Sequence, residues 1–400
     1  MATSHFEIPS EFQDKIRYVE PLDLRSDEEI LEALTRPPPV ASEKNIWAFW
    51  HAGIRDMPPW CQRNIIAWSR ICGPQWTIRV LDVVDNSPNN ALNWVKEEDL
   101  PKAFTTKTMD GPLGYTGPHS ADFLRGICLY QYGGAWMDVG SILFRSIDEI
   151  CWRKLEDANE PYQVAGPWMY QRGIANHFIA SRKGDPFIKH WHDLFMELWK
   201  DRTSANGLYE HPLMAHAKDI KLEDVEARGF SWSWDTPIPI VLEYIAQICC
   251  WIRLSILKEP NDGFDGANYY EKKILLFDAL WEDWPAEALI GWNGEELFDL
   301  LNTRLDADSE SEAYKKAYKT VWYLLASSTM QKVTRAGGLT TTKALGALWD
   351  MKENEEKDRE PGTFAELLRY GSVHFRQTRE APYVPPMEAQ GIIHKGVLEP

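Results

Sequence analysis

The sequence has no long hydrophobic run and no apolar leader. No segment approaches the roughly 18 consecutive apolar residues that a membrane-spanning helix needs. The first twenty residues alternate acidic, basic and proline positions and lack the apolar core of a secretory signal. These absences exclude a membrane span and predict a cytoplasmic protein.

Cysteine and positive charge are also scarce. The chain of 400 residues has six cysteines and no Cys-x-x-Cys pair, so a disulfide scaffold is not expected. Its 43 Lys and Arg residues face 60 Asp and Glu residues, which gives a net charge of -17. Nucleic-acid binding needs clustered basic residues, so DNA is not expected as a partner.

Tryptophan is abundant, with 19 copies, and 44% of the residues are hydrophobic. This composition is sufficient for a sizeable core. Residues 46–51 and 76–81 are compact apolar stretches, as expected of strands, and residues 59–72 between them have helical spacing. Strand, helix and strand within this length are typical of a right-handed βαβ unit.

Further strands are predicted at residues 135–139, 142–144, 162–165 and 177–181, and helices at residues 26–35, 187–199, 241–257 and 312–330. Strands alternate with helices up to about residue 185, and helices dominate afterwards. The pattern predicts an α/β fold with helical additions. We divide the chain into a lead-in (1–44), a core (45–200), helical additions that complete the core (201–349) and a charged loop with a tail (350–400).

A helix over residues 120–132 carries the first chemically informative side chains. Ser120 is its expected N-cap. Asp122 and Arg125 are three residues apart and therefore point the same way. The alternative interpretation is an ordinary ion pair on a helix surface.

The helix runs into Gly133 and Gly134, where the chain can turn sharply. The following strand ends at Asp138. In open α/β sheets, ligands bind outside the carboxyl ends of the strands. Asp138 is therefore a candidate ligand-binding carboxylate, with a simple turn residue as the alternative.

The order Asp122-x-x-Arg125, Gly133-Gly134 and Asp138 resembles the signature of GT-A-fold glycosyltransferases. Within that group it is most similar to the capsular polysaccharide synthesis protein family, in a fungal-type form. The resemblance covers residues 45–200. It implies a GT-A-like mixed sheet flanked by helices and an enzyme that transfers a sugar from a nucleotide-sugar donor to an acceptor, in secondary metabolism or glycan synthesis.

Two further segments carry the resemblance. Residues 47–51 (Trp-Ala-Phe-Trp-His) are similar to the family's first strand, which lines the nucleotide site. The resemblance implies that Trp47 stacks near the base. His51 flanks the proposed site in sequence and is a candidate general base, with a turn residue as the alternative. Residues 176–181 are similar to a later strand that lines the sugar pocket, which makes Asn176 a substrate-binding candidate.

The resemblance also implies roles for the motif itself. Asp122 and Arg125 would contact the donor sugar and its phosphates, Asp138 would hold a metal ion or the ribose, and Gly133 and Gly134 would lie beside the substrate. His119 flanks the site in sequence and is a further candidate, with a turn role as the alternative. An arginine that faces a ligand contributes to binding and not to packing, so we expect replacement of Arg125 to leave stability nearly unchanged.

One position departs from the family pattern. Gly140 stands where the Asp-x-Asp motif has its second acid. With Asp138 as the single motif ligand, we expect weak binding of Mg²⁺ or Mn²⁺ that depends on the donor's phosphates. No acid at a diagnostic spacing replaces the missing ligand; the candidates are Asp235, Asp262, Asp265, Glu282 and Asp283.

Two alternatives to a glycosyltransferase remain at this point. An arginine-containing cyclodipeptide synthase would use aminoacyl-tRNAs on the same scaffold, and the glycine at position 140 fits such a repurposed site. The acidic net charge opposes a tRNA partner. A non-catalytic binding module is the third possibility, which the retention of Asp122, Arg125 and Asp138 disfavours.

Overall fold

A mixed sheet forms the centre of the molecule. The computed structural model describes residues 5–106, 109, 116–260, 263–335, 339–385 and 387–400. Within these residues, eight strands form the main sheet, with β7 (Gly173–Ile174) paired to β6 alone. The order of the other strands is β13 (Tyr383–Val384), β10 (Ile274–Asp278), β6 (Val164–Tyr170), β8 (Phe178–Ser181), β4 (Gly134–Met137), β2 (Asn45–Phe49) and β3 (Thr77–Leu81).

Most strands of this sheet run in one direction. Strands β3, β2 and β4 are parallel neighbours, and β6 and β10 are parallel to each other. Strand β8 lies antiparallel between β4 and β6, and β13 is antiparallel to β10. The carboxyl ends of β2, β3, β4, β6 and β10 therefore share one edge with the amino end of β8.

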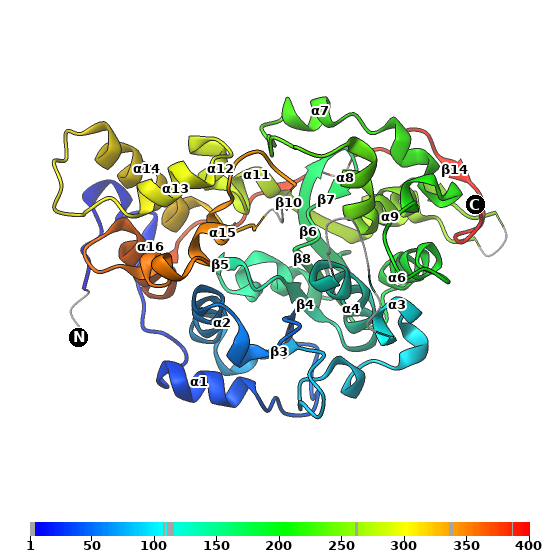
Figure 1. Cartoon of the computed structure of the whole chain (residues 1–400), viewed down its shortest axis with the longest axis horizontal. Coiled ribbons are helices and arrows are strands. Elements are labelled where there is room, and N and C mark those ends of the chain that lie inside the picture. The colour runs from blue at the N-terminus through cyan, green and yellow to red at the C-terminus, as the bar shows by residue number, and fades with distance from the viewer. Residues whose placement is uncertain (1–4, 107–108, 110–115, 261–262, 336–338, 386) are drawn as a thin grey trace.

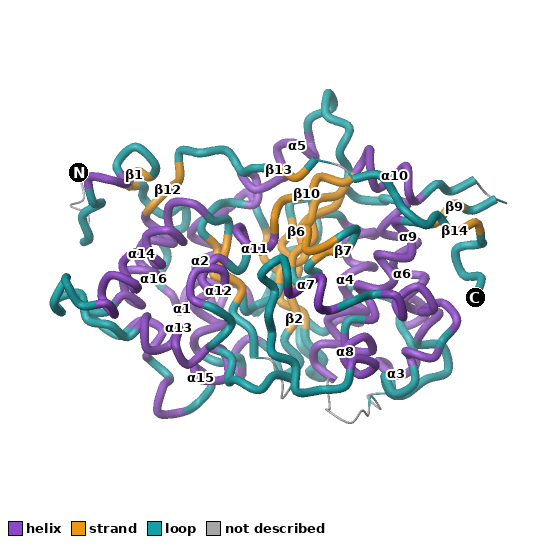
Figure 2. Tube along the Cα trace, turned by 90° about the horizontal axis from the view of Figure 1, so that it is seen from above, coloured by secondary structure: helices purple, strands orange, loops and turns teal. Residues whose placement is uncertain are grey.

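Helices cover both faces of the sheet (Figures 1 and 2). Their bounds are α1 (Asp27–Leu34), α2 (Pro59–Cys72), α3 (Lys102–Thr105), α4 (Thr116–Tyr132), α5 (Arg153–Glu156), α6 (Pro186–Leu198), α7 (Leu222–Glu226), α8 (Ile238–Tyr244), α9 (Ala246–Ser255), α10 (Gly266–Lys273), α11 (Ala279–Glu282), α12 (Pro285–Ile290), α13 (Gly294–Leu301), α14 (Glu312–Ser327), α15 (Leu345–Trp349) and α16 (Phe364–His374). Figure 2 shows α4, α6 and α9 on one side of the strands and α2, α14 and α16 on the other.

The alternation of side chains along β2 explains the two-sided packing. Ile46 and Ala48 join the core on the side of α2, whereas Trp47 and Phe49 join the core on the side of α4 and α6. A strand turns successive side chains to opposite faces, so a strand that is apolar throughout is covered on both. The predicted mixed α/β sheet flanked by helices is confirmed.

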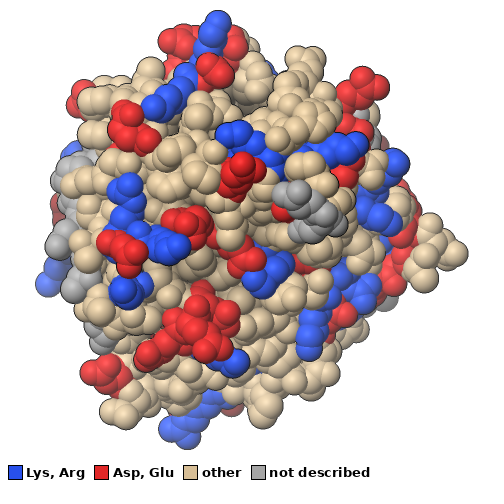
Figure 3. Space-filling view, turned by 90° about the vertical axis from the view of Figure 1, so that its right-hand side faces the viewer, with Lys and Arg blue, Asp and Glu red and all other residues tan. Residues whose placement is uncertain are grey.

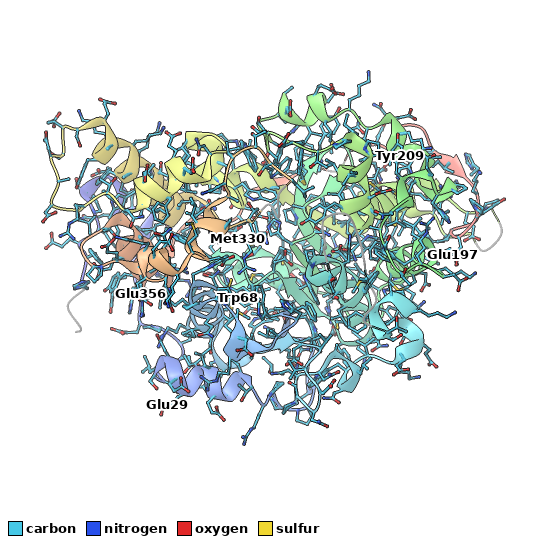
Figure 4. All side chains as sticks on the ribbon, viewed as in Figure 1. Glu29, Trp68, Glu197, Tyr209, Met330 and Glu356 are labelled. Carbon is cyan, nitrogen blue, oxygen red and sulfur yellow. The ribbon has the colours of Figure 1, made fainter. Side chains whose placement is uncertain are left out.

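In the part of the chain that the structure describes, three two-stranded pairings join segments that are distant in sequence. Strand β5 (Ser141–Leu143) pairs antiparallel with β11 (Met330–Lys332). Strand β1 (Ile16–Tyr18) pairs with β12 (Phe375–Gln377), and β9 (Leu257–Lys258) pairs with β14 (Ile393–His394). Strand β11 lies near the middle of the molecule, where Met330 is labelled in Figure 4. The β5–β11 pairing thus places a late segment next to the end of β4.

Several predicted element ends are confirmed and others are corrected. Helix α2 spans the predicted residues, and Ser26 caps α1 in a capping box with Glu29. Helix α4 begins at Thr116, so Ser120 lies in its second turn and donates its hydroxyl to the Thr116 carbonyl at 2.7 Å. The N-cap prediction for Ser120 is wrong because Pro118, which needs no hydrogen-bonding partner for its nitrogen, lies in the first turn.

The helix predicted at residues 241–257 is two helices, α8 and α9, which meet at Ile245. Within the described part of the chain, no single helix is long and apolar enough to cross a membrane, and α8 with α9 reaches that length only as a pair bent by 78°.

Candidate functional site

Asp138 leaves β4 at the carboxyl edge of the sheet, as predicted. Its backbone N–H donates to the carbonyl of His177 at 2.9 Å, just before β8 begins. Asn176 precedes His177 at the same edge, because β8 runs against β4. The end of the family motif, at Asp138, and the start of the predicted pocket strand, at Asn176, therefore meet at this edge of the sheet.

Arg125 lies beneath this edge on helix α4, which packs on β2 and β4. Its guanidinium is paired with the carboxylate of Asp122 and donates to the amide oxygen of Gln247. It lies 5.2 Å from the ring centre of Trp136 and 3.5 Å from Oδ1 of Asp138. The side chain is 3% exposed. The expectation that Arg125 only faces a ligand is therefore wrong, because its contacts also bind α4 to β4 and α9.

Amide groups complete the surroundings of Asp122. The Asn176 amide donates to Oδ1 of Asp122 at 3.2 Å and to Oε1 of Gln247 at 3.0 Å. Gln247 in turn donates to the backbone carbonyl of Asp122 at 2.5 Å. Asp122 is held in a fixed position, because its carboxylate accepts from Arg125 and Asn176 and its backbone carbonyl accepts from Gln247.

The carboxylate of Asp138 is bound by cationic and neutral donors. Lys332 Nζ lies 2.9 Å from Oδ2, and the indole N–H of Trp136 donates to Oδ1 at 3.2 Å. Burial alone would raise the pKa of Asp138, but the charges of Lys332 and Arg125 hold that pKa at about 2. Asp138 is therefore ionised at neutral pH, and its side chain is 30% exposed.

A second pair lies behind Asp138. His177 Nε2 is 2.9 Å from Oδ2 of Asp283, and both side chains are buried. Burial raises the pKa of Asp283 and lowers the pKa of His177. Both shifts favour the uncharged form of the side chain. The ring of Trp284 covers His177 at 4.8 Å between centres.

The two candidate histidines have different surroundings. His119 is buried on α4, with Nδ1 3.7 Å from Oδ2 of Asp122 and its ring 5.1 Å from that of Trp199. His51 is exposed in the turn after β2, at the same edge of the sheet. The structure thus brings His119 next to the motif acid and leaves His51 at the rim.

The structure corrects the role inferred for Trp47. This side chain is fully buried, and its indole N–H donates to the carbonyl of Gly133 at 3.0 Å. Its ring packs against Trp94 and Tyr132. Trp47 has no surface for a nucleobase because β2 is a central strand whose two faces are both covered.

The roles inferred for Gly133 and Gly134 are corrected as well. Both residues have positive φ values, +71° and +104°, and they turn the chain from α4 into the amino end of β4. Asp138 follows the other end of that strand. The two glycines therefore belong to the opposite edge of the sheet from Asp138, where Gly133 neighbours Glu43 and Lys183. They shape the turn and do not line the site.

Sequence reasoning missed Gln247 and Lys332. Gln247 lies in the apolar helix α9, and Lys332 ends the short strand β11. Neither has a local motif that could have identified it. A polar residue within an apolar helical stretch was the available signal for Gln247.

Three of the five acids proposed as replacements for the missing ligand have side-chain partners of their own. Asp265 caps α10, Glu282 pairs with Arg379 at 2.7 Å, and Asp283 faces His177. Asp235 has its backbone N–H bonded to Leu339, and Asp262 lies outside the described residues. Among the residues that the structure describes, no group of three or more His, Cys, Asp or Glu side chains could hold a metal ion.

Taken together, the site offers two cations, two carboxylates and two amides at the carboxyl edge of the sheet. Arginine and lysine can bind phosphate oxygens, and carboxylates and amides can bind sugar hydroxyls. Such a set can hold a phosphorylated sugar and stabilise charge on a departing phosphate.

Comparison with known proteins gives matches along nearly the whole chain. The family described as capsular polysaccharide synthesis protein matches residues 10–216. A probable glycosyltransferase, FCK3, of Fusarium pseudograminearum is 51% identical over 99% of this chain and 100% of its own length. The O-glycosyltransferase braB of Annulohypoxylon truncatum is 40% identical over 95% and 91%. The glycosyltransferase afumC of Aspergillus fumigatus is 38% identical over 94% and 96%.

Among solved structures, the PaToxG glycosyltransferase covers 50% of this chain and 82% of its own, with 16% identity and a TM-score of 0.26. That likeness is too weak to add to the argument, whereas the family match and the full-length relatives agree. The chain belongs to the capsular polysaccharide synthesis protein family and is a transferase, related over nearly its full length to fungal glycosyltransferases.

Proposed function

We propose that the protein transfers a sugar from a nucleotide-sugar donor to a hydroxyl group of an acceptor, at the carboxyl edge of the sheet. The observation that carries the proposal is the hydrogen-bonded network of Asp122, Arg125, Asp138, Asn176 and Gln247, in which Asp122, Arg125 and Gln247 are buried and Asp138 and Asn176 are partly exposed. Removing charged groups from water is costly, so a network of this kind at the ligand-binding edge is unusual without a ligand to bind.

The chemistry assigns work to each part of the site. The bond between C1 of the sugar and the donor's phosphate oxygen breaks, and its electron pair leaves with the nucleoside diphosphate. The acceptor oxygen bonds to C1, and its proton passes to solvent. Arg125 and Lys332 offset the negative charge on the departing diphosphate, because both cations reach the edge at Asp138. Asp122 and Asn176 orient sugar hydroxyls.

The name of one relative supports a hydroxyl acceptor. The protein from Annulohypoxylon truncatum is named an O-glycosyltransferase, and it shares nearly the whole length of this chain. We extend that bond type, and nothing more of the acceptor, to this protein.

The aminoacyl-tRNA alternative has less support. A tRNA partner needs a continuous basic surface, since phosphate contacts supply much of the affinity. On the face in Figure 3, acidic side chains interrupt the basic ones throughout. The full-length relatives in the comparison are also glycosyltransferases.

A panel of UDP- and GDP-sugars tests the proposal. We expect the purified protein to release the nucleoside diphosphate from one donor and Asp138→Asn to abolish that release. The matched control is Asp148→Asn, since Asp148 also pairs with a lysine, at 2.8 Å, but near the amino end of β2. Failure to turn over any donor, together with a cyclic dipeptide formed from charged tRNA, would establish the alternative instead.

A further inference from the structure

Asp138, the carboxylate to which the family motif assigns a metal ion, forms an ion pair with Lys332. In a metal-dependent site of the motif type, two acids and the donor's phosphates surround the ion. Here Oδ2 of Asp138 is 2.9 Å from Lys332 Nζ, and Oδ1 receives the indole N–H of Trp136. Mg²⁺ and Mn²⁺ prefer several hard oxygen ligands, and one carboxylate engaged by donors on both oxygens does not supply them. The residues present therefore do not fit the divalent ion that the motif implies.

Lys332 reaches Asp138 because of the glycine at position 140. The N–H of Val333 donates to the Gly140 carbonyl at 2.7 Å, and β11 pairs with β5 immediately after Gly140. A Cβ atom built on Gly140 would lie 2.5 Å from the Val333 carbonyl oxygen and 3.5 Å from Lys332 Nζ. An aspartate at this position would therefore collide with the segment that brings the lysine. The loss of the acid and the arrival of the cation are two parts of one arrangement.

The metal site of the family motif and the Lys332–Asp138 pair have the same net charge. A divalent cation with two carboxylates has no net charge, and neither has one ammonium group with one carboxylate. The lysine side chain is 13% exposed, so it is largely but not fully removed from solvent. An ammonium group has three N–H donors, and the hydrogen bond to Asp138 uses one of them. The others can reach phosphate oxygens.

We propose that the Lys332 ammonium takes the place of the divalent cation in this site, so that the enzyme binds the diphosphate of its donor and stabilises the leaving nucleoside diphosphate without a metal ion. The proposal rests on the proposed glycosyl transfer. The acceptor oxygen displaces the diphosphate at C1, the electron pair of the broken bond stays on the diphosphate oxygen, and Lys332 and Arg125 offset its charge. Asp138 holds the ammonium in position in place of coordinating a metal.

Calorimetry with UDP and with GDP tests the lysine role directly. For whichever nucleotide binds, we expect the Kd of the wild-type protein to differ by less than about twofold between EDTA and Mn²⁺. Lys332→Ala should raise the Kd at least tenfold in EDTA, and Lys332→Arg should raise it less. The same order should hold for kcat with the matching nucleotide sugar.

Lys44→Ala is the matched control. Lys44 forms a comparable, partly buried pair with Asp148 at 2.8 Å, but it precedes the amino end of β2, at the other edge of the sheet. We expect Lys44→Ala to lower the melting temperature about as much as Lys332→Ala and to leave the Kd unchanged.

Several results would overturn the proposal. Wild-type binding or turnover that needs Mn²⁺ would refute the lysine role and leave glycosyl transfer standing, and this arm needs no variant to fold. A folded Lys332→Ala protein with the wild-type Kd would refute it as well. If the wild-type protein binds neither nucleotide in EDTA or in Mn²⁺ and turns over no donor, both the lysine role and the proposed function fail.

Discussion

Replacing Arg125 by alanine should destabilise the protein as well as inactivate it. The substitution removes a guanidinium that is 3% exposed and leaves the carboxylate of Asp122, 10% exposed, without its main cationic partner. Breaking a buried ion pair by removing one partner costs about 3–5 kcal/mol. The entropy of unfolding for 400 residues is about 0.8 kcal/mol per kelvin, so the expected fall in Tm is about 4–6 °C.

Thermal unfolding followed by circular dichroism measures this loss. Arg55→Ala is the control, because Arg55 is 42% exposed and its ion pairs with Glu28 and Glu32 lie at the surface. Such pairs contribute about 0–1 kcal/mol, so its Tm should change by about 1 °C or less. The double variant Asp122→Asn, Arg125→Met should regain much of the lost stability, because it removes both charges together.

A particular combination of results would refute this reasoning. If Arg125→Ala changes the Tm no more than Arg55→Ala does, then Arg125 is not part of the packing between α4, β4 and α9. Its contacts with Asp122 and Gln247 would then be dispensable for folding, and a purely ligand-facing role would return.

Three further outcomes follow from burial. Burial raises the pKa of Glu287 to about 7, so stability should fall as pH rises from about 4.5 to about 7, and Glu287→Gln should lack that slope in melting curves. Burial would raise the pKa of the buried Asp358, but its ion pairs with the partly exposed Arg369 and Arg63 lower it. The stability that these pairs provide above pH 3.8 should be lost as the pH falls below that value, and Asp358→Asn should flatten this acid limb. Gly140→Ala places its Cβ 2.5 Å from the Val333 oxygen and should cost about 1–3 kcal/mol by denaturant unfolding, whereas Gly117→Ala, whose nearest new neighbour lies 3.9 Å away, should not.

The sequence predicted the sheet better than it predicted the helix ends. Residues 46–51 and 76–81 proved to be neighbouring parallel strands because an uninterrupted apolar run can be buried on both faces. The start of α4 was predicted wrongly because Ser120 precedes a stretch with helical spacing and therefore resembles an N-cap, although the helix begins four residues earlier, at Thr116. The break at Ile245 between α8 and α9 has no glycine or proline at the break itself that would have marked it.

The sequence motif identified only those site residues that lie close together in the sequence. Asp122, Arg125 and Asp138 lie within one short stretch, and their proximity follows from a helix, a turn and a strand. Gln247 lies 125 residues after Asp122 in the sequence, and Lys332 lies 194 residues after Asp138. Their contacts with these residues depend on how α9 and β11 pack, which no spacing in the sequence encodes. The same limit explains Trp47, since a motif position does not reveal that its side chain points into a core.

The boundary of the family match has a consequence for the chemistry. The match spans residues 10–216 and contains Asp122, Arg125 and Asp138, the part of the site that the motif describes. Gln247, which holds Asp122 in place, and Lys332, which neutralises Asp138, both lie beyond it. The shared segment thus provides the carboxylates and one arginine, whereas the later segment decides which cation meets the carboxylate at the end of β4. Under the proposed lysine role, replacement of the metal ion requires no change in the Asp-x-x-Arg helix, but only a glycine at position 140 and a strand that pairs beside it.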